Sequence, residues 1–331
     1  MPFSVEKPGI LTLVQDAGRW GYQSKGLTVS GPMDQFSFRM GNVMLGNDES
    51  DAALEVTLFG LEIIFHDERR VVLAGADLVM NIDGAPAASW TVHRAAPGSR
   101  LAITGLPYSP GVGCRAYLCI SGGIDVPLVM GSRSTFMRGK IGGYKVRALV
   151  AGDVLGMLEP KPLWRRSAGF VCPPELRPSR TWDEPLDTLE GPQIDAFTLK
   201  GIETFFNEAF RVTNEADRMG YRLDGPNIEH RAGADIVSDG IVPGAVQVPG
   251  DGKPIVMMSD CQTTGGYTKI AVVSTWSAAS LAQKISGDIV RFRKVSGNEA
   301  TRNLINFEND LRRLAELRAS YRSRGGHSNE R

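Results

Sequence analysis

The residues from Asp260 to Tyr267 carry an unusual amount of side-chain chemistry in a short stretch. Asp260, Gln262, Thr263 and Thr264 offer one carboxylate, one amide and two hydroxyl groups; two glycines follow, and Tyr267 adds a flat ring with a polar tip. Glycine lets the backbone approach a ligand closely or adopt positive φ. Because a planar amide needs both donors and acceptors, this loop suits a small amide ligand. The same residues also fit a turn in which Asp260 and Thr263 bond their own backbone.

Two short apolar runs must position this loop. Ile255–Met258 precedes it and Ile270–Val273 follows it. Such runs around a glycine-containing connection are typical of a β-hairpin. The sequence therefore predicts a hairpin whose connection carries the polar groups.

A second polar cluster lies near the N-terminus. Asp16 and Arg19 can pair with each other, or Arg19 can hold an anionic group in a two-pronged hydrogen bond. Asp34 stands at the start of a predicted helix, where a carboxylate commonly accepts from free backbone N–H groups. That structural role is the favoured interpretation of Asp34.

Two further clusters have the residue types of an anion site. Arg133 lies among Ser, Thr and Gly residues that can cradle a carboxylate or phosphate, although a solvated loop also explains them. Arg218 and Arg222 can form a second anion site or only a salt-bridged surface.

Several kinds of site are missing from the sequence. It contains no G-x-S-x-G motif, no defensible Ser-His-Asp set and no Walker-type nucleotide motif. The four histidines and four cysteines are scattered and form no C-x-x-C pair, so a zinc site of the usual spacing is excluded and no metal is expected. Chemistry at this site must then depend on carboxylates, amides, hydroxyls and a reactive substrate.

The composition is that of an ordinary soluble globular protein. The 331 residues are 42% hydrophobic and 22% charged, with a formal net charge of zero. Neutrality argues against nucleic acid or a membrane surface as the main partner. No apolar run approaches the ~20 residues that span a bilayer. The first residues show no secretory pattern, so we expect a cytoplasmic protein with reduced thiols.

Most apolar runs are short, and turn signals separate them. This pattern predicts a mainly β fold of sandwich or barrel type rather than repeated βαβ units. The chain is long for one core, which favours two domains. Apolar residues at helical spacing predict short helices over residues 33–45, 195–206 and 276–284.

Residues 160–192 hold seven of the 19 prolines and show little periodicity. We interpret them as a connecting arm between an N-terminal β module, residues 1–159, and a C-terminal β-barrel module, residues 193–297.

Beyond the second module the pattern becomes helical. Residues 298–323 have apolar side chains at alternating spacings of four and three, and Ser296 with Glu299 forms a capping box ahead of them. The sequence predicts an amphipathic helix that docks on its own domain or on another protein of a complex. Residues 324–331 are expected to form a disordered tail.

The chain also contains a faint internal repeat. Residues 16–22 (DAGRWGY) resemble residues 215–221 (EADRMGY), and each copy is followed later by a Gly-Asp pair before an apolar run. Those pairs are residues 152–153 and 287–288. The likeness predicts two related β modules.

Taken in order, the motifs resemble those of the allophanate hydrolase subunit 2 group, also called the biotin-dependent carboxyltransferase family. They lie at residues 14–19 (VQDAGR), 30–34 (SGPMD), 46–47 (GN), 122–124 (GGI), 131–135 (GSRST), 191–193 (GPQ), 217–220 (DRMG), 244–247 (GAVQ) and 260–267 (DCQTTGGY). The last motif is long and specific. It usually has Arg where this chain has Cys261, and position 32 is often Ala rather than Pro.

The resemblance implies a mainly β architecture of two cyclophilin-like β-barrel modules, to which the sequence adds a few short helices and the C-terminal amphipathic helix. It also implies a component of a multi-subunit enzyme that acts on a small planar amide. One form of the family is the C component of an ATP-dependent 5-oxoprolinase, which opens the lactam ring of 5-oxoproline to give glutamate together with the A and B components.

Two alternatives remain open. One is the carboxyltransferase component of a urea or amide carboxylase, which receives CO₂ from carboxybiotin on a separate carrier. The other is a non-catalytic antagonist that binds a KipI-like partner, the homologue of the 5-oxoprolinase B component. The chain has no biotinyl-lysine motif and no ATP-grasp domain, so ATP and carboxybiotin would be supplied by other chains.

The resemblance also suggests roles for individual residues. Asp260 and Gln262 are expected to act on the substrate amide, in the catalytic positions. The expected substrate-binding residues, which include an arginine from each anion cluster, are Thr263, Thr264, Tyr267, Asp16, Arg19, Asp34, Arg133 and Arg218.

Overall fold

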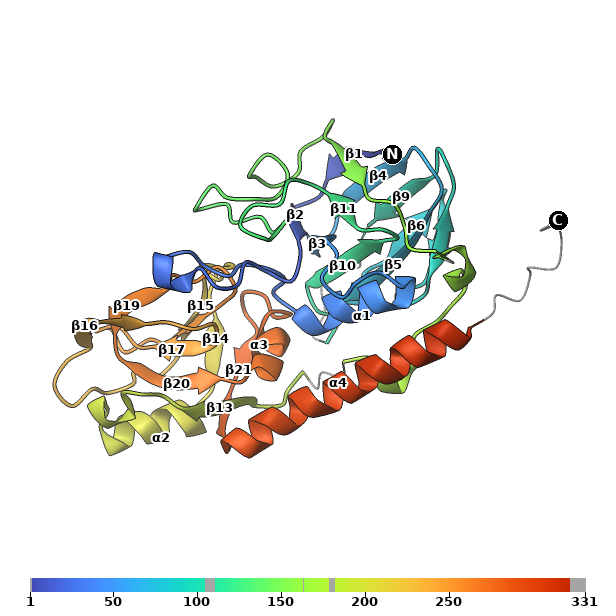
Figure 1. Ribbon diagram of the computed structural model, residues 1–331. Helices are drawn as coiled ribbons and strands as arrows, with labels where there is room; N and C mark the ends of the chain where they lie inside the picture. The colour runs from blue at the N-terminus through green and yellow to red at the C-terminus, as the bar shows by residue number, and fades with distance from the viewer. Residues whose placement is uncertain (1, 105–110, 163, 179–181, 322–331) are drawn as a thin grey trace, which may run out of the picture.

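Two β modules lie side by side, and one long helix runs along both of them (Figure 1). The computed structural model describes residues 2–104, 111–162, 164–178 and 182–321. The predicted disordered tail at 324–331 lies outside these described residues.

The first module consists of two antiparallel sheets. The seven-stranded sheet has the order β11-β12-β1-β4-β9-β6-β7. Its strands are β1 (Pro2–Pro8), β4 (Leu61–Phe65), β6 (Met80–Ile82), β7 (Ala85–Ala87), β9 (Arg100–Ile103), β11 (Ile124–Asp125) and β12 (Val154–Met157). The five-stranded sheet has the order β2-β3-β10-β5-β8. Its strands are β2 (Leu11–Gln15), β3 (Ala53–Thr57), β5 (Arg69–Gly75), β8 (His93–Ala95) and β10 (Arg115–Ile120).

The central strands of the five-stranded sheet are apolar on both faces because both faces are covered. Along β5, Val71 and Leu73 join the core between the two sheets, whereas Val72 and Ala74 pack with the helices on the outer face. Side chains alternate between the faces of a strand, so a continuous apolar run is what such a strand requires.

The second module is one eight-stranded sheet that almost closes into a barrel. Its order is β21-β14-β15-β18-β17-β20-β13-β22. The strands are β13 (Leu186–Glu190), β14 (Phe210–Val212), β15 (Gly220–Asp224), β17 (Ala245–Gln247), β18 (Ile255–Met257), β20 (Lys269–Val273), β21 (Ile289–Val290) and β22 (Phe292–Lys294). The two end strands, β21 and β22, are separated in the chain only by Arg291, so the edges of the sheet are brought together. A two-stranded ribbon, β16 (Asp235–Gly240) with β19 (Thr264–Tyr267), stands beside the barrel.

Short helices occur where the apolar spacing predicts them. They are α1 (Gln35–Leu45), α2 (Leu199–Asn207) and α3 (Thr275–Leu281), with 3-10 turns at Gln23–Lys25, Trp164–Ser167, Pro174–Leu176 and Ile194–Ala196. Asp34 caps α1 by accepting from the Ser37 backbone N–H (3.2 Å), as its position before the helix predicts.

Helix α4 (Gly297–Ser320) fastens the two modules together. It begins at the predicted capping box, in which Ser296 and Glu299 bond each other's backbone N–H groups. Its Phe307 ring packs against Phe36 of α1 (centroids 4.6 Å apart) and lies near Trp276 of α3. The helix therefore touches the first module and the barrel at once, which fixes their relative position.

The proline-rich arm runs between the modules in irregular turns, and strand β13 begins inside it at Leu186. Leu186 and Thr188 are buried, Leu186 within the barrel core, so the chain becomes regular there despite the nearby prolines.

The two copies of the internal sequence repeat have the same structure only in part. Residues 16–22 form no strand, whereas 220–224 form β15. The Gly-Asp pairs, in contrast, make the same turn in both modules. Gly152 and Asp153 exchange backbone bonds with Val5 (both 2.8 Å), and Gly287 with Asp288 does so with Val212 (both 2.9 Å).

The predicted fold class is confirmed: the chain is mainly β, with barrel-type modules, a few short helices and a C-terminal amphipathic helix. Among residues 2–104, 111–162, 164–178 and 182–321, no helix combines the length and the apolar character needed to cross a bilayer.

Candidate functional site

The loop from Ser259 to Thr263 lies where the two modules meet. It connects β18 to β19, and the first-module segment 28–32 is bound along it. Backbone N–H of Ser30 donates to the Ser259 carbonyl (3.1 Å), and the Ser259 hydroxyl donates to the Pro32 carbonyl (3.2 Å).

The hairpin prediction is wrong. Strands β18 and β20 do not pair with each other, because both pair with β17, which lies between them. The connection instead forms β19, which leaves the barrel to pair with β16. Glycine permits this path: a Cβ at Gly265 would overlap the side chain of Ile241.

Asp260 is buried in a two-pronged ion pair with Arg218. Arg218 donates from Nε to Oδ2 (2.8 Å) and from Nη2 to Oδ1 (3.0 Å), and the Ser30 hydroxyl donates to Oδ1 (2.6 Å). The same guanidinium reaches Glu55 of the first module (2.5 Å). Burial by itself lowers the pKa of Arg218, but the charges of Asp260 and Glu55 outweigh it and the pKa is raised. Arg218 therefore stays charged and ties the loop to the other module.

The ion pair continues into a buried polar seam between the modules. Glu55 accepts from the hydroxyl of Tyr117 (2.8 Å), and that hydroxyl oxygen accepts from the backbone N–H of Asp34 (2.7 Å). Asp34 in turn accepts from the Gln283 amide of the barrel (3.0 Å). Burial raises the pKa of Tyr117 well above its usual value, so its hydroxyl remains a neutral donor. Asp34 and Arg218 thus belong to the junction of the modules.

Asp16 and Arg19 form a separate cluster inside the first module. Asp16 accepts from the Ser132 and Ser134 hydroxyls (both 2.6 Å) and from the Arg133 backbone N–H. Arg19 donates to the carbonyls of Val129 and Ser134 (both 3.0 Å). Burial lowers the pKa of Arg19, partly offset by the charges of Asp16 and Asp260.

One glycine makes the Arg19 contact possible. A Cβ at Gly142, where φ is 66°, would overlap the Ser134 carbonyl oxygen that Arg19 binds. The side chain of Arg133 points elsewhere, since it pairs with Asp125 (3.8 Å) and only its backbone serves Asp16.

Two cavities flank the loop. The first, which we call the neutral cavity, has a volume of about 420 Å³. It is lined by Ala17, Trp20, Gln23, Thr28, Val29, Ser30, Pro32, Gln35, Ile241, Val242, Pro243, Ser259, Cys261, Gln262, Thr263 and Thr275. None of these residues is ionised at neutral pH, because burial raises the pKa of the Cys261 thiol to about 12.

The second, which we call the charged cavity, has a volume of about 430 Å³. It is lined by Arg138, Glu215, Asp217, Met219, Gly220, Arg222, Gln247, Ile255, Met257, Gln262 and Tyr267. Gln262 is exposed and lines both cavities. Thr263 faces the neutral cavity, Tyr267 the charged cavity, and Thr264 lines neither.

The structure thus sorts the predicted residues into three groups. Gln262, Thr263 and Tyr267 line cavities, Asp260, Arg218 and Asp34 form the buried seam, and Asp16 with Arg19 holds a loop of the first module. Sequence reasoning missed Glu55 and Tyr117, and it assigned no role to Ser30 of the 30–34 motif. Glu55 had a signal, since it is the one charged residue of the otherwise apolar strand β3.

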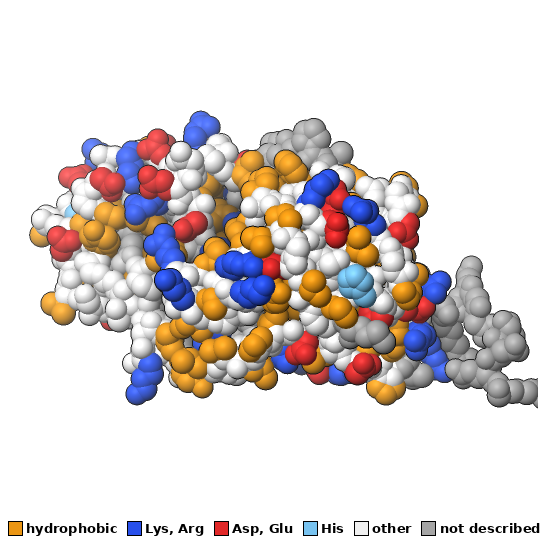
Figure 2. Space-filling model, turned by 90° about the horizontal axis from the view of Figure 1, so that it is seen from above, with side chains coloured by type: hydrophobic (Ala, Val, Ile, Leu, Met, Phe, Trp, Pro, Cys, Tyr) orange, Lys and Arg blue, Asp and Glu red, His pale blue; other side chains and the backbone are white. Residues whose placement is uncertain are grey.

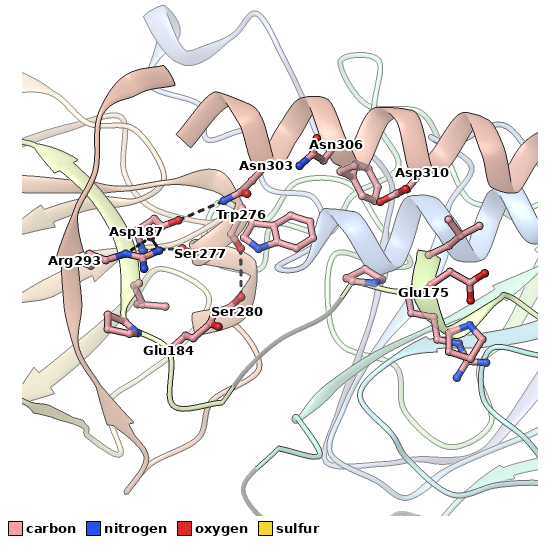
Figure 3. A pocket seen from close by; sticks show the side chains of 17 residues that line it. Glu175, Glu184, Asp187, Trp276, Ser277, Ser280, Arg293, Asn303, Asn306 and Asp310 are labelled. Atoms are coloured by element: carbon pink, nitrogen blue, oxygen red, sulfur yellow. Dashed lines mark hydrogen bonds and ion pairs between the residues drawn. The ribbon is translucent and has the colours of Figure 1, made fainter. Parts of the chain in front are cut away.

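A third cavity, the arm cavity, lies away from the loop (Figure 3). Residues 174–178 and 184–187 of the arm line it, with Trp276, Ser277, Ser280, Arg293, Asn303, Asn306, Phe307 and Asp310. Asp187 accepts from Arg293 (2.5 Å) and from Asn303 of α4 (3.3 Å). These bonds attach α4 to the start of the barrel. No predicted site residue lies here.

Within the part of the chain that the structure describes, no three His, Cys, Asp or Glu side chains gather in a way that could hold a metal ion.

The chain is similar to known proteins in both sequence and fold. The model of the family described as "Carboxyltransferase domain, subdomain A and B" matches residues 25–294. The chain belongs to this carboxyltransferase-domain family. The match covers both modules, and the resemblance found in the sequence motifs is confirmed.

Several members of the carboxyltransferase-domain family are similar over most of this chain. The C component of 5-oxoprolinase from Escherichia coli is 35% identical over 89% of this chain and 91% of its own length. The urea amidolyase of Lachancea kluyveri is 36% identical over 89% of this chain but only 17% of its own length. The crystal structure of the K. lactis urea amidolyase superposes with a TM-score of 0.87 and 32% identity, over 95% of this chain and 20% of that chain.

Proposed function

We propose that this carboxyltransferase-domain protein is the C component of an ATP-dependent 5-oxoprolinase, a complex that opens the lactam ring of 5-oxoproline to give glutamate. The similarity to the E. coli protein over nearly the full length of both chains supports this assignment. The observation that carries it in the structure is that Gln262 lines both of the cavities beside the loop.

A glutamine side chain matches a lactam in hydrogen bonding. Its Oε1 accepts and its Nε2 donates, so it can bind the lactam N–H and carbonyl together. Thr263 adds a hydroxyl on the neutral side and Tyr267 adds a ring on the charged side. We assign Gln262 to contact with the substrate amide.

Asp260 acts through the loop, as a positioning residue. Both of its oxygens are occupied, by Arg218 and Ser30, and the side chain is buried. Its carboxylate holds the loop against the first module. The loop can therefore present the Gln262 amide in one fixed orientation, which lowers the entropic cost of binding.

The other components of the reaction belong to partner chains. Homologues of the A and B components would complete the complex and use ATP, because this chain has no Walker-type motif. The four free, buried cysteines suit the reducing cytoplasm in which we place the complex.

The test is reconstitution. The chain is combined with candidate A and B components, and 5-oxoproline-dependent ATP hydrolysis is measured with and without it. We expect turnover only when all three are present, and a loss of at least about tenfold for Asp260→Ala, because the loop loses its anchor. Asp251→Ala, an exposed turn residue, is the control. Equal turnover of the wild-type and Asp260→Ala complexes, or full turnover without this chain, contradicts the proposal.

A second candidate is favoured by the neutral cavity. Urea is uncharged, and a cavity with no ionised side chain suits it, as does the close superposition with urea amidolyase. In that case the chain would transfer CO₂ to urea from carboxybiotin on a separate carrier. Urea-dependent turnover with a biotinylated carrier, in place of 5-oxoproline-dependent turnover, would identify this function.

A further inference from the structure

The charged cavity contains two arginines that come from different modules. Arg222 lies on β15 of the barrel, and Arg138 lies on the long loop of the first module that projects toward the barrel, drawn in green in Figure 1. Lys and Arg side chains also gather near the middle of the face seen from above (Figure 2). The charged cavity therefore offers a ligand cationic groups from both modules.

Both guanidinium groups are available to a ligand. Arg222 is paired with Glu215 at 3.0 Å and Arg138 with Asp217 at 3.4 Å, and all four side chains are roughly half exposed or more. Exposed pairs of this kind contribute little to stability, so an incoming carboxylate can replace the present partner at little cost. A buried pair such as Arg218 with Asp260 has no such freedom.

The two partners differ in how firmly they are held. Asp217 accepts from the backbone N–H groups of Met219 (2.7 Å) and Gly220 (3.1 Å), so its position is fixed and it orients Arg138. The carboxylate of Glu215 is two-thirds exposed and lies against Arg222. A ligand can therefore displace Glu215 from Arg222 most easily. Arg138 is already oriented by Asp217 and can act as a second donor.

The charged cavity also includes the residue that we assign to the substrate amide. Gln262 and Tyr267 line the charged cavity together with both arginines. The neutral cavity shares Gln262 but offers no cation. Of the two cavities beside the loop, the charged cavity alone offers partners for both groups of a ligand that carries an amide and a carboxylate.

We propose that Arg222, assisted by Arg138, binds the carboxylate of the substrate, so that the charged cavity selects lactams bearing a carboxylate over uncharged amides. This inference rests on the proposed 5-oxoprolinase function. Gln262 then holds the lactam amide, and the two arginines hold the carboxylate in a two-pronged hydrogen bond. Because the carboxylate does not react, its binding contributes to affinity more than to the chemical step.

The experiment compares variants in the reconstituted complex. The KM for 5-oxoproline and the kcat are measured for Arg222→Gln, Arg222→Lys and Arg138→Gln. The control is Arg211→Gln, an exposed arginine of the same barrel that lies outside the cavity. We expect the KM to rise about fivefold in Arg222→Gln, the upper end for an ion pair between half-exposed groups, with kcat within about twofold. Arg138→Gln should give a smaller increase, Arg222→Lys should recover part of the loss, and the control should match wild type.

A lactam without the carboxylate gives the decisive second measurement. With 2-pyrrolidinone, wild-type and Arg222→Gln complexes should have the same weak kcat/KM, because the arginine has nothing to bind. A wild-type complex that turns over 5-oxoproline with a KM unchanged in the Arg222→Gln, Arg138→Gln double variant overturns this inference and leaves the proposed function standing. A wild-type complex with no 5-oxoproline-dependent turnover overturns both.

Discussion

The two modules use a buried Asp and Arg in different ways. In the first module, neutral hydroxyl and backbone groups donate to Asp16, and two backbone carbonyls accept from Arg19. In the second, Arg218 and Asp260 bond each other directly, and Arg218 also binds Glu55 across the junction. The first arrangement orders a loop within one module, whereas the second depends on charges from both modules. Arg19 and Arg218 occupy matching positions of the sequence repeat, but only the Arg218 cluster can transmit a disturbance of the junction to the Gln262 loop.

The largest expected effect comes from removing the arginine in each cluster. Arg218→Met leaves two carboxylates buried together without a cation, and we expect it to lower the free energy of unfolding by about 3–5 kcal/mol. Arg19→Met leaves only uncharged carbonyls unpaired and should cost about 1–3 kcal/mol. Urea unfolding of both variants beside wild type measures the difference. Equal losses, or a larger loss for Arg19→Met, would remove the distinction between the clusters.

A matched pair of serines separates stability from activity. The hydroxyls of Ser30 and Ser132 each donate to a buried carboxylate at 2.6 Å, Asp260 in one case and Asp16 in the other. Either Ser→Ala change should cost about 1–2 kcal/mol of stability.

Their effects on turnover should differ, because only Ser30 holds the loop that carries Gln262. We expect kcat/KM of the reconstituted complex to fall about tenfold in Ser30→Ala and to stay within about twofold in Ser132→Ala. If the two variants lost activity alike, the loop would not be the link between the junction and the site.

The Gly-Asp turn, which occurs once in each module, can be tested by its dependence on pH. Hydrogen bonds from Arg147 (2.6 and 2.7 Å) lower the pKa of Asp153 in the first-module turn. A carboxyl group whose pKa is lower in the folded state stabilises the fold above its unfolded pKa, and that contribution disappears as the pH falls through the folded value. Asp153→Asn should therefore lower the free energy of unfolding at pH 7, and it should cost almost nothing at a pH below the folded pKa, which lies under the usual 3.8. A loss that is the same at both pH values would show that the ion pair is not its cause.

The smallest effect concerns Cys261, which follows Asp260 in the loop. Because burial raises the pKa of this thiol to about 12, iodoacetamide at pH 8 should leave it unmodified in the native protein and modify it after unfolding. Ser30→Ala loosens the loop and should increase the native labelling rate at Cys261 several-fold, measured by mass spectrometry of the peptide. Rapid labelling in the wild-type protein would mean that the first module does not seal the loop.

The sequence predicted the helices and strands better than it predicted which strands pair with each other. Helix α4 and its capping box follow from Ser296, Glu299 and the spacing of apolar residues, all of which are local. The hairpin prediction failed because the partner of a strand depends on distant residues: β17, with its own apolar run, inserts between β18 and β20. Local pattern cannot show which of several short strands lies beside another.

The candidate site shows the same limit. The residue types around 260–267 indicated an amide ligand, and the structure brings Gln262, Thr263 and Tyr267 to two cavities. What the sequence could not show is that Asp260 faces inward, because its partner Arg218 is 42 residues away in the chain and Ser30 is 230 away. The first contact forms when the barrel folds, and the second forms only when the modules dock.

The central claim is that the carboxamide of Gln262, the residue that lines both cavities beside the loop, binds the substrate amide. The most direct measurement is kcat/KM for 5-oxoproline in complexes containing Gln262→Ala, with Gln193→Ala, outside both cavities, as the control. The account predicts a loss of about 100-fold for Gln262→Ala, as expected for two lost hydrogen bonds, and none for the control. Equal activity of the two variants would contradict it.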